Sequence, residues 1–203
     1  MTNHIFSTSR ALFFALLPVS LLASGCSDSG DVDPVVAQAE SIDPDQETAY
    51  ITEVGLDHHT IYTDIAIAAS PDEVWAVLTD FDQMPNWSST LQGIDGELAD
   101  GAMVIVNFDL MGTLLEVPHT LIYEPEEMMF GWADPVQGFE GIVDDHAYTV
   151  ARTDGELTLF VQTDAFVGTD DSVTTASLAQ QLLPLYEAFN RELKAEVERR
   201  SAR

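Results

Sequence analysis

Apolar and polar residues alternate through IYTDIAIAA (61–69), and polar residues bound this run, so the pattern predicts a strand. A helix is predicted to start directly afterwards. Ser70 stands at the N-cap, Pro71 at the first helical position and Glu73 three residues after the cap, which together form a capping box. The chain is therefore expected to pass from its first strand into a short helix at this point.

The short helix has one apolar face, made by Val74, Trp75 and Leu78. Residues 80–87 predict a second short helix or turn. Trp75 is expected to pack the first helix against a sheet, whereas Trp87 leads into the next strand and is a candidate for the rim of a cavity. The two tryptophans are therefore predicted to have different roles.

The middle of the chain is rich in predicted strands. Short turn sequences such as Asp-Gly and Asp-Pro separate apolar segments, which is typical of an antiparallel meander. The segments span residues 91–98, 102–110, 114–123, 127–133, 144–152 and 156–168. Together with 61–69 they predict a sheet of about seven strands.

A long helix is predicted over residues 174–200, with Pro184 in an early turn or at a kink. Its apolar residues recur at three- and four-residue steps, as on one helix face: Leu178, Leu182, Tyr186, Phe189, Leu193 and Val197. The order of elements is strand, two short helices, about six strands and a long helix. It predicts a two-layer α+β domain, with the long helix packed on one face of a curved antiparallel sheet.

The N-terminal 25 residues have the features of a signal peptide, with Arg10 before an apolar run at 11–23. This run is too short to span a bilayer of about 30 Å. It ends in LLASGC, which resembles the lipobox of bacterial lipoproteins and implies lipid modification at Cys26 after cleavage. An ordinary signal peptide followed by an incidental cysteine is the alternative. The expected organisation is a signal peptide (1–25), a flexible acidic tether (26–55) and a folded domain (56–203), in the bacterial cell envelope and facing the periplasm or the exterior.

The composition is strongly acidic, with 7 Lys and Arg against 35 Asp and Glu and a net charge of −28. Such a surface repels nucleic acid phosphates and anionic lipid headgroups, so neither is an expected partner. Membrane attachment would therefore have to come from the anchor. The charge is interpreted either as adaptation to saline surroundings or as an acidic recognition surface.

Several stretches resemble the START-like or SRPBCC superfamily and, within it, polyketide cyclase/dehydrase-like proteins. They are IAIAASPDEVWAVLTDFDQMPNW, EMMFGW, DDHAYTVART, GELTLFVQTDAFVG and LYEAFNRELKAEVE, and the resemblance covers roughly residues 60–198. It implies a helix-grip fold, in which a curved sheet wraps around the C-terminal helix and leaves a hydrophobic cavity. Ligands in this superfamily range from lipids to hormones and polyketides, and only some members are catalysts.

Strand parity indicates which side chains could face such a cavity. His146, Tyr148 and Val150 share an apolar face of their strand, and the resemblance places the set from Thr158 to Phe166 inward on the next one. The predicted ligand-binding residues are Trp87, His119, Tyr123, Phe130, Trp132, His146, Tyr148, Phe160, Gln162, Asp164, Phe166, Tyr186 and Phe189. A few polar groups in an apolar chamber are the usual composition of a small-molecule site.

The leading hypothesis is membrane-tethered binding or carriage of a hydrophobic small molecule or lipid. One alternative is a cyclase/dehydratase-like enzyme, in which Asp164 orients His146 for proton transfer. The other is an interaction module without a ligand. No cofactor is expected, and no metal site, because the pair His58 and His59 has no partner cluster at ligand spacing.

Overall fold

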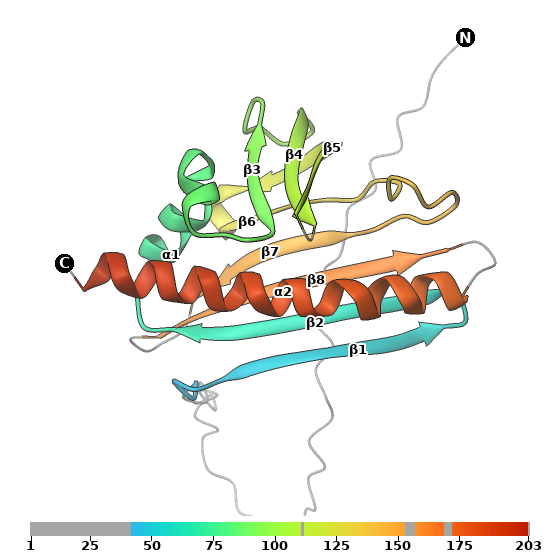
Figure 1. The fold of residues 1–203 in the computed structure, drawn as a ribbon. Helices are drawn as coiled ribbons and strands as arrows, with labels where there is room; N and C mark the ends of the chain where they lie inside the picture. Colours follow the sequence, from blue (N-terminus) through green and yellow to red (C-terminus); the bar gives the residue numbers. More distant parts are fainter. Residues whose placement is uncertain (1–41, 111, 153–156, 169–171, 203) are drawn as a thin grey trace, which may run out of the picture. The chain divides into compact units, whose positions relative to one another are not determined.

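The strands of this protein form one antiparallel sheet that is strongly curved (Figure 1). The computed structural model describes residues 42–110, 112–152, 157–168 and 172–202. In that part of the chain the elements are β1 (Glu47–Gly55), β2 (His58–Ile67), α1 (Pro71–Leu78), η1 (Phe81–Asn86), β3 (Leu91–Asp95), β4 (Met103–Leu110), β5 (Thr113–Glu124), η2 (Pro125–Glu127), β6 (Met129–Trp132), β7 (His146–Ala151), β8 (Thr158–Val167) and α2 (Ser172–Ser201). The predicted signal peptide and Cys26 lie outside the described residues.

The eight described strands are ordered β1-β2-β8-β7-β6-β5-β4-β3. From β3 to β8 the chain is a simple meander, and the β1–β2 hairpin then pairs with β8. Helix α2 lies along β2 and β8 on one face of the sheet (Figure 1). This arrangement is the predicted α+β helix-grip architecture, which is confirmed.

The prediction of a flexible tether up to residue 55 is wrong for its last part, because residues 47–55 form strand β1. This strand pairs with β2 along its length, and Ile51 packs against the core. It was missed because its remaining side chains are largely polar or exposed, including Tyr50 and Val54. As an edge strand, β1 is stabilised mainly by backbone pairing, which composition does not reveal.

The capping box at the start of α1 forms as predicted. The Ser70 hydroxyl accepts a hydrogen bond from the Glu73 amide, and the Glu73 carboxylate accepts one from the Ser70 amide at 2.9 Å. Trp75 is half-buried and packs on Tyr123 and Phe130, with ring centroids 6.2 Å apart in each pair. This tryptophan therefore fixes α1 against the sheet, as its position on the apolar face predicts.

Two apolar clusters lie beneath α2, one toward each end. The larger contains Val150 and Phe160 of the sheet with Phe189 of the helix, and the smaller contains Phe166 with Leu178. The positions between them along β7, β8 and α2 carry buried polar side chains: His146, Gln162, Asp164 and Asn190. The polar residues are thus concentrated where the two apolar clusters meet.

Gly131 of β6 sets the position of the neighbouring strand β7, because a Cβ at this position would lie 2.1 Å from the carbonyl oxygen of His146. We expect Gly131→Ala to lower the free energy of unfolding by about 3 kcal/mol, since the backbone of β7 would have to move. Urea denaturation followed by circular dichroism measures this change. Gly55→Ala is the matched control, because its nearest neighbouring atom is 3.8 Å away. Equal stability of the two variants would contradict the prediction.

Candidate functional site

A cavity of about 310 Å³ lies between the sheet and α2. Most of the side chains that line it are apolar. The lining residues come from strands β3 to β8, from α2 and from the connection between β6 and β7. The cavity reaches the surface at Leu115 and Phe139, which are 37% and 38% exposed. Its size and composition are those of a site for a small apolar molecule.

Eight of the thirteen predicted ligand-binding residues line the cavity: His119, Trp132, His146, Gln162, Asp164, Phe166, Tyr186 and Phe189. The family resemblance identified the inward set on β8 correctly, because every second residue from Thr158 to Phe166 is buried. The long-helix periodicity likewise placed Tyr186 and Phe189 on the covered face.

The other five do not line the cavity, and all of them belong to or pack on the larger apolar cluster. They are Trp87, Tyr123, Phe130, Tyr148 and Phe160. Trp87 was predicted at the rim, but its ring packs on Phe189 with centroids 5.4 Å apart. Phe189 lines the cavity, whereas Trp87 does not.

Gln162 makes three hydrogen bonds, one to the neighbouring strand β7 and two to α2. Its Oε1 lies 3.2 Å from His146 Nε2, and its Nε2 donates to Asn190 Oδ1 and to the Tyr186 carbonyl oxygen. Because Oε1 can only accept, this arrangement assigns the proton of a neutral His146 to Nε2. The other ring nitrogen of His146, Nδ1, lies 3.4 Å from the Tyr186 hydroxyl oxygen. Asn190 was missed by sequence reasoning, although it lies one helical turn after Tyr186.

Asp164 and His146, which the enzyme alternative pairs, do not form a direct hydrogen bond. The two residues are opposite each other in the β7–β8 ladder, as parity allows, but Asp164 Oδ2 and His146 Nδ1 are 4.0 Å apart. Asp164 Oδ2 instead accepts a short hydrogen bond from the Tyr186 hydroxyl, and the Tyr186 ring stacks on His146 at 4.6 Å. Tyr186 of α2, and not His146, is therefore the hydrogen-bond partner of Asp164.

Burial shifts the pKa values of the titratable groups at the centre of the site. It lowers the pKa of His146 to about 3, since a charged imidazole would lose its hydration there. Burial, together with the charge of Asp144, raises the pKa of Asp164 well above its usual value. The pKa of Tyr186 is also raised, mainly by burial. Burial therefore disfavours the charged form of each of these three side chains.

Asp144 is a second acidic group in the cavity lining, and sequence reasoning missed it. Its Oδ2 accepts a hydrogen bond of 3.1 Å from Trp132 Nε1, and burial raises its pKa to about 6. The available signal was parity, because Asp144 lies two residues before His146 and so on the same face.

His119 lies behind Trp132, with ring centroids 4.5 Å apart in a stacked arrangement. Its Nδ1 is 3.3 Å from Asp134 Oδ2, and burial lowers its pKa. His119, Trp132 and His146 thus form a continuous wall of rings, since Trp132 also contacts His146 edge-on at 5.2 Å.

No lysine or arginine is among the described residues that line the cavity. The basic residues that the structure does describe are paired with acids elsewhere: Arg152, Arg191, Lys194, Arg199 and Arg200. In the same part of the chain, no group of three or more His, Cys, Asp or Glu side chains is arranged to hold a metal ion. The charged groups available to a ligand are therefore carboxyl groups.

Comparison with known proteins agrees with this architecture. A family described as "Polyketide cyclase / dehydrase and lipid transport" matches residues 58–198. The chain belongs to this family, within the START/SRPBCC superfamily. No curated protein matches the sequence significantly.

Solved structures share the fold at low sequence identity. The Zhui aromatase/cyclase from Streptomyces sp. R1128 is 17% identical, with 71% of this chain and 96% of that chain covered and a TM-score of 0.58. A START superfamily protein from Mycobacterium smegmatis is 17% identical over 69% and 97%, with a TM-score of 0.54. Ginseng major latex-like protein 151 from Panax ginseng is 19% identical over 70% and 98%, with a TM-score of 0.55. At these identities the likeness concerns the fold.

The raised pKa of Asp144 predicts a pH-dependent effect of Asp144→Asn. An aspartate in the unfolded chain has a pKa of about 3.9, so the folded state binds this proton more tightly. The resulting stability is fully present below the unfolded value and is lost as pH rises through about 6. Asparagine does not titrate. We therefore expect the variant to melt about 2–4 °C above the parent at pH 7.5, and the difference to shrink at pH 4.5.

Melting curves recorded by circular dichroism at the two pH values measure this difference. Asp145→Asn is the control, because it removes the same charge from an exposed neighbouring position. A gain for Asp144→Asn that is no larger than that of the control at pH 7.5 would contradict the assignment.

Proposed function

We propose that this chain binds and carries a hydrophobic small molecule or lipid in the cavity beneath α2, held at the surface of a membrane by a lipid anchor on Cys26. The observation that supports binding is the cavity itself. It is lined mainly by apolar side chains and reaches the surface, whereas the clusters on either side of it are filled. Burying apolar ligand surface there is favourable at roughly 25 cal/mol per Å².

The enzyme alternative, a cyclase/dehydratase-like activity that uses His146 and Asp164, has less support from the geometry. The two side chains are not hydrogen-bonded to each other, and burial lowers the pKa of His146 to about 3. A general base that operates near neutral pH is most effective with a pKa close to 7. Binding is therefore the function that the site supports best.

Filling the cavity should weaken binding. Val117 lines it from β5, and Val117→Trp adds an indole ring to a space of about 310 Å³. We expect the neutral fluorescent probe N-phenyl-1-naphthylamine to bind the parent with one site, and the variant at least about tenfold more weakly, which corresponds to 1.4 kcal/mol. Fluorescence titration measures both affinities.

Leu114→Trp is the matched control, because this residue lies on the same strand, is 73% exposed and does not line the cavity. It should bind the probe like the parent. Absence of probe binding by the parent protein, or equal weakening by both substitutions, would contradict the proposed cavity function.

The anchor is proposed from the sequence around Cys26. No helix among the described residues is long and apolar enough to cross a membrane. Acyl chains contribute about 0.8 kcal/mol per buried methylene, so lipid modification would suffice for stable attachment. We expect Cys26→Ser to move the protein from the membrane fraction to the soluble fraction of a bacterial host, as measured by immunoblotting. Unchanged membrane association would contradict the anchor.

A further inference from the structure

Building on the proposed binding function, we infer that the cavity selects apolar molecules that carry a protonated amine, and that the ammonium group is held by Asp144 and Asp164. This assigns a chemical class to the ligand and a recognition role to two carboxyl groups. The inference rests on the placement of these groups, on their unused hydrogen-bonding atoms and on the charges that the lining contains.

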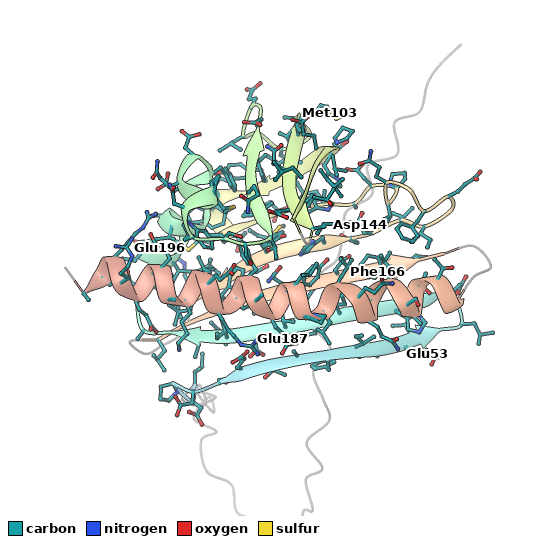
Figure 2. All side chains as sticks on the ribbon, viewed as in Figure 1. Glu53, Met103, Asp144, Phe166, Glu187 and Glu196 are labelled. Atoms are coloured by element: carbon teal, nitrogen blue, oxygen red, sulfur yellow. The ribbon has the colours of Figure 1, made fainter. Side chains whose placement is uncertain are left out.

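The register of β7 and β8 places both carboxyl groups on the same face of the sheet. His146 is opposite Asp164, and the pairing continues outward, with mutual backbone hydrogen bonds between Asp145 and Ala165. Asp144 is therefore opposite Phe166 and diagonal to Asp164, where side chains are roughly 7–8 Å apart. Asp144 and Phe166 are labelled in Figure 2. Both acids line the same cavity.

Each of these carboxyl groups has one oxygen that the protein leaves unused. Asp144 Oδ2 is bonded to Trp132 and Asp164 Oδ2 to Tyr186, but Oδ1 of each is buried without a partner in hydrogen-bonding geometry among the described residues. Asp164 is only 1% exposed. Buried polar atoms normally have partners, so two such acceptors in one cavity point to a ligand that donates hydrogen bonds.

The sign of the charges excludes acidic ligands. A carboxylate or phosphate headgroup would find no lysine or arginine among the described lining residues, and it would lie beside Asp144. The whole chain carries a net charge of −28, which adds unfavourable long-range repulsion. Fatty acids and anionic phospholipids are therefore poor candidates.

A cation fits the lining better than a neutral donor does. Hydrogen bonds between an ammonium group and a carboxylate are roughly twice as strong as neutral ones. Trp132 and Tyr186 both line the cavity, and the π electrons of such rings attract cations. An apolar body attached to the amine would occupy the side of the cavity lined by Phe166 and Leu178. One small molecule thus satisfies the unused acceptors, the charge and the apolar walls together.

Three ligands of matched shape test the inference: 2-(2-naphthyl)ethylamine, 2-(2-naphthyl)ethanol and 2-naphthylacetate. Their affinities are measured at pH 7.5 by competition with N-phenyl-1-naphthylamine, in 0.3 M NaCl so that non-specific attraction to the acidic surface is screened. We expect the amine to bind at least about tenfold more tightly than the alcohol, and the carboxylate to bind more weakly than both.

Two substitutions then locate the effect. Asp144→Asn should bring the affinities of the amine and the alcohol to within about threefold of each other. Asp145→Asn, which removes an equal charge from the exposed neighbouring position, should keep the preference for the amine. Circular dichroism melting curves establish that both variants are folded.

The possible results separate this inference from the proposed function. If N-phenyl-1-naphthylamine binds but the alcohol or the carboxylate competes as well as the amine, the amine inference is overturned and the cavity function stands. The same holds if Asp144→Asn leaves the preference intact, or if Asp145→Asn abolishes it. If neither the probe nor any naphthyl compound binds the parent protein, the proposed function itself fails.

Discussion

The side-chain amide of Gln162 is the interaction on which the rest of the site depends. This amide is buried on β8, and both its oxygen and its nitrogen are hydrogen-bonded. Its Oε1 accepts from His146, and its Nε2 donates to Asn190 and to the backbone of α2. An unpaired amide in this place would cost several kcal/mol, so helix and sheet are held in one relative position. The bond from His146 also fixes the tautomer of that imidazole.

The cavity follows from this polar connection. Apolar side chains pack closely on either side of it, but around Gln162 they give way to groups whose hydrogen bonds set their spacing. The helix cannot pack more closely onto the sheet without breaking those bonds.

Acidic residues have different partners in the interior and on the surface. Outside, carboxylates are hydrated or paired with the few basic residues, whereas inside Asp144 and Asp164 are held by Trp132 and Tyr186, one oxygen each.

Most of the architecture could be predicted from the sequence, because period-two and helical patterns reflect burial directly. The edge strand β1 could not, since it buries little and is held by backbone pairing. Strand parity allowed His146 and Asp164 to share the inward face, and both line the cavity. It could not show that Tyr186, from a helix 22 residues further along the chain, would take the hydrogen bond instead. Trp87 was misplaced for the same reason, because its neighbour Phe189 comes from that helix.

The position of β2 in the sheet has a consequence for how the chain folds. Its partners are β1, which is adjacent in sequence, and β8, whose residues follow about a hundred positions later, as in the pair Ile61 and Asp164. The first half of the protein thus forms an incomplete sheet until β8 has been synthesised, and α2 packs onto it only after that. Such distant pairing makes folding slow relative to local helical proteins. During synthesis, the open edge of β2 must be kept from pairing with other chains until its own final strand arrives.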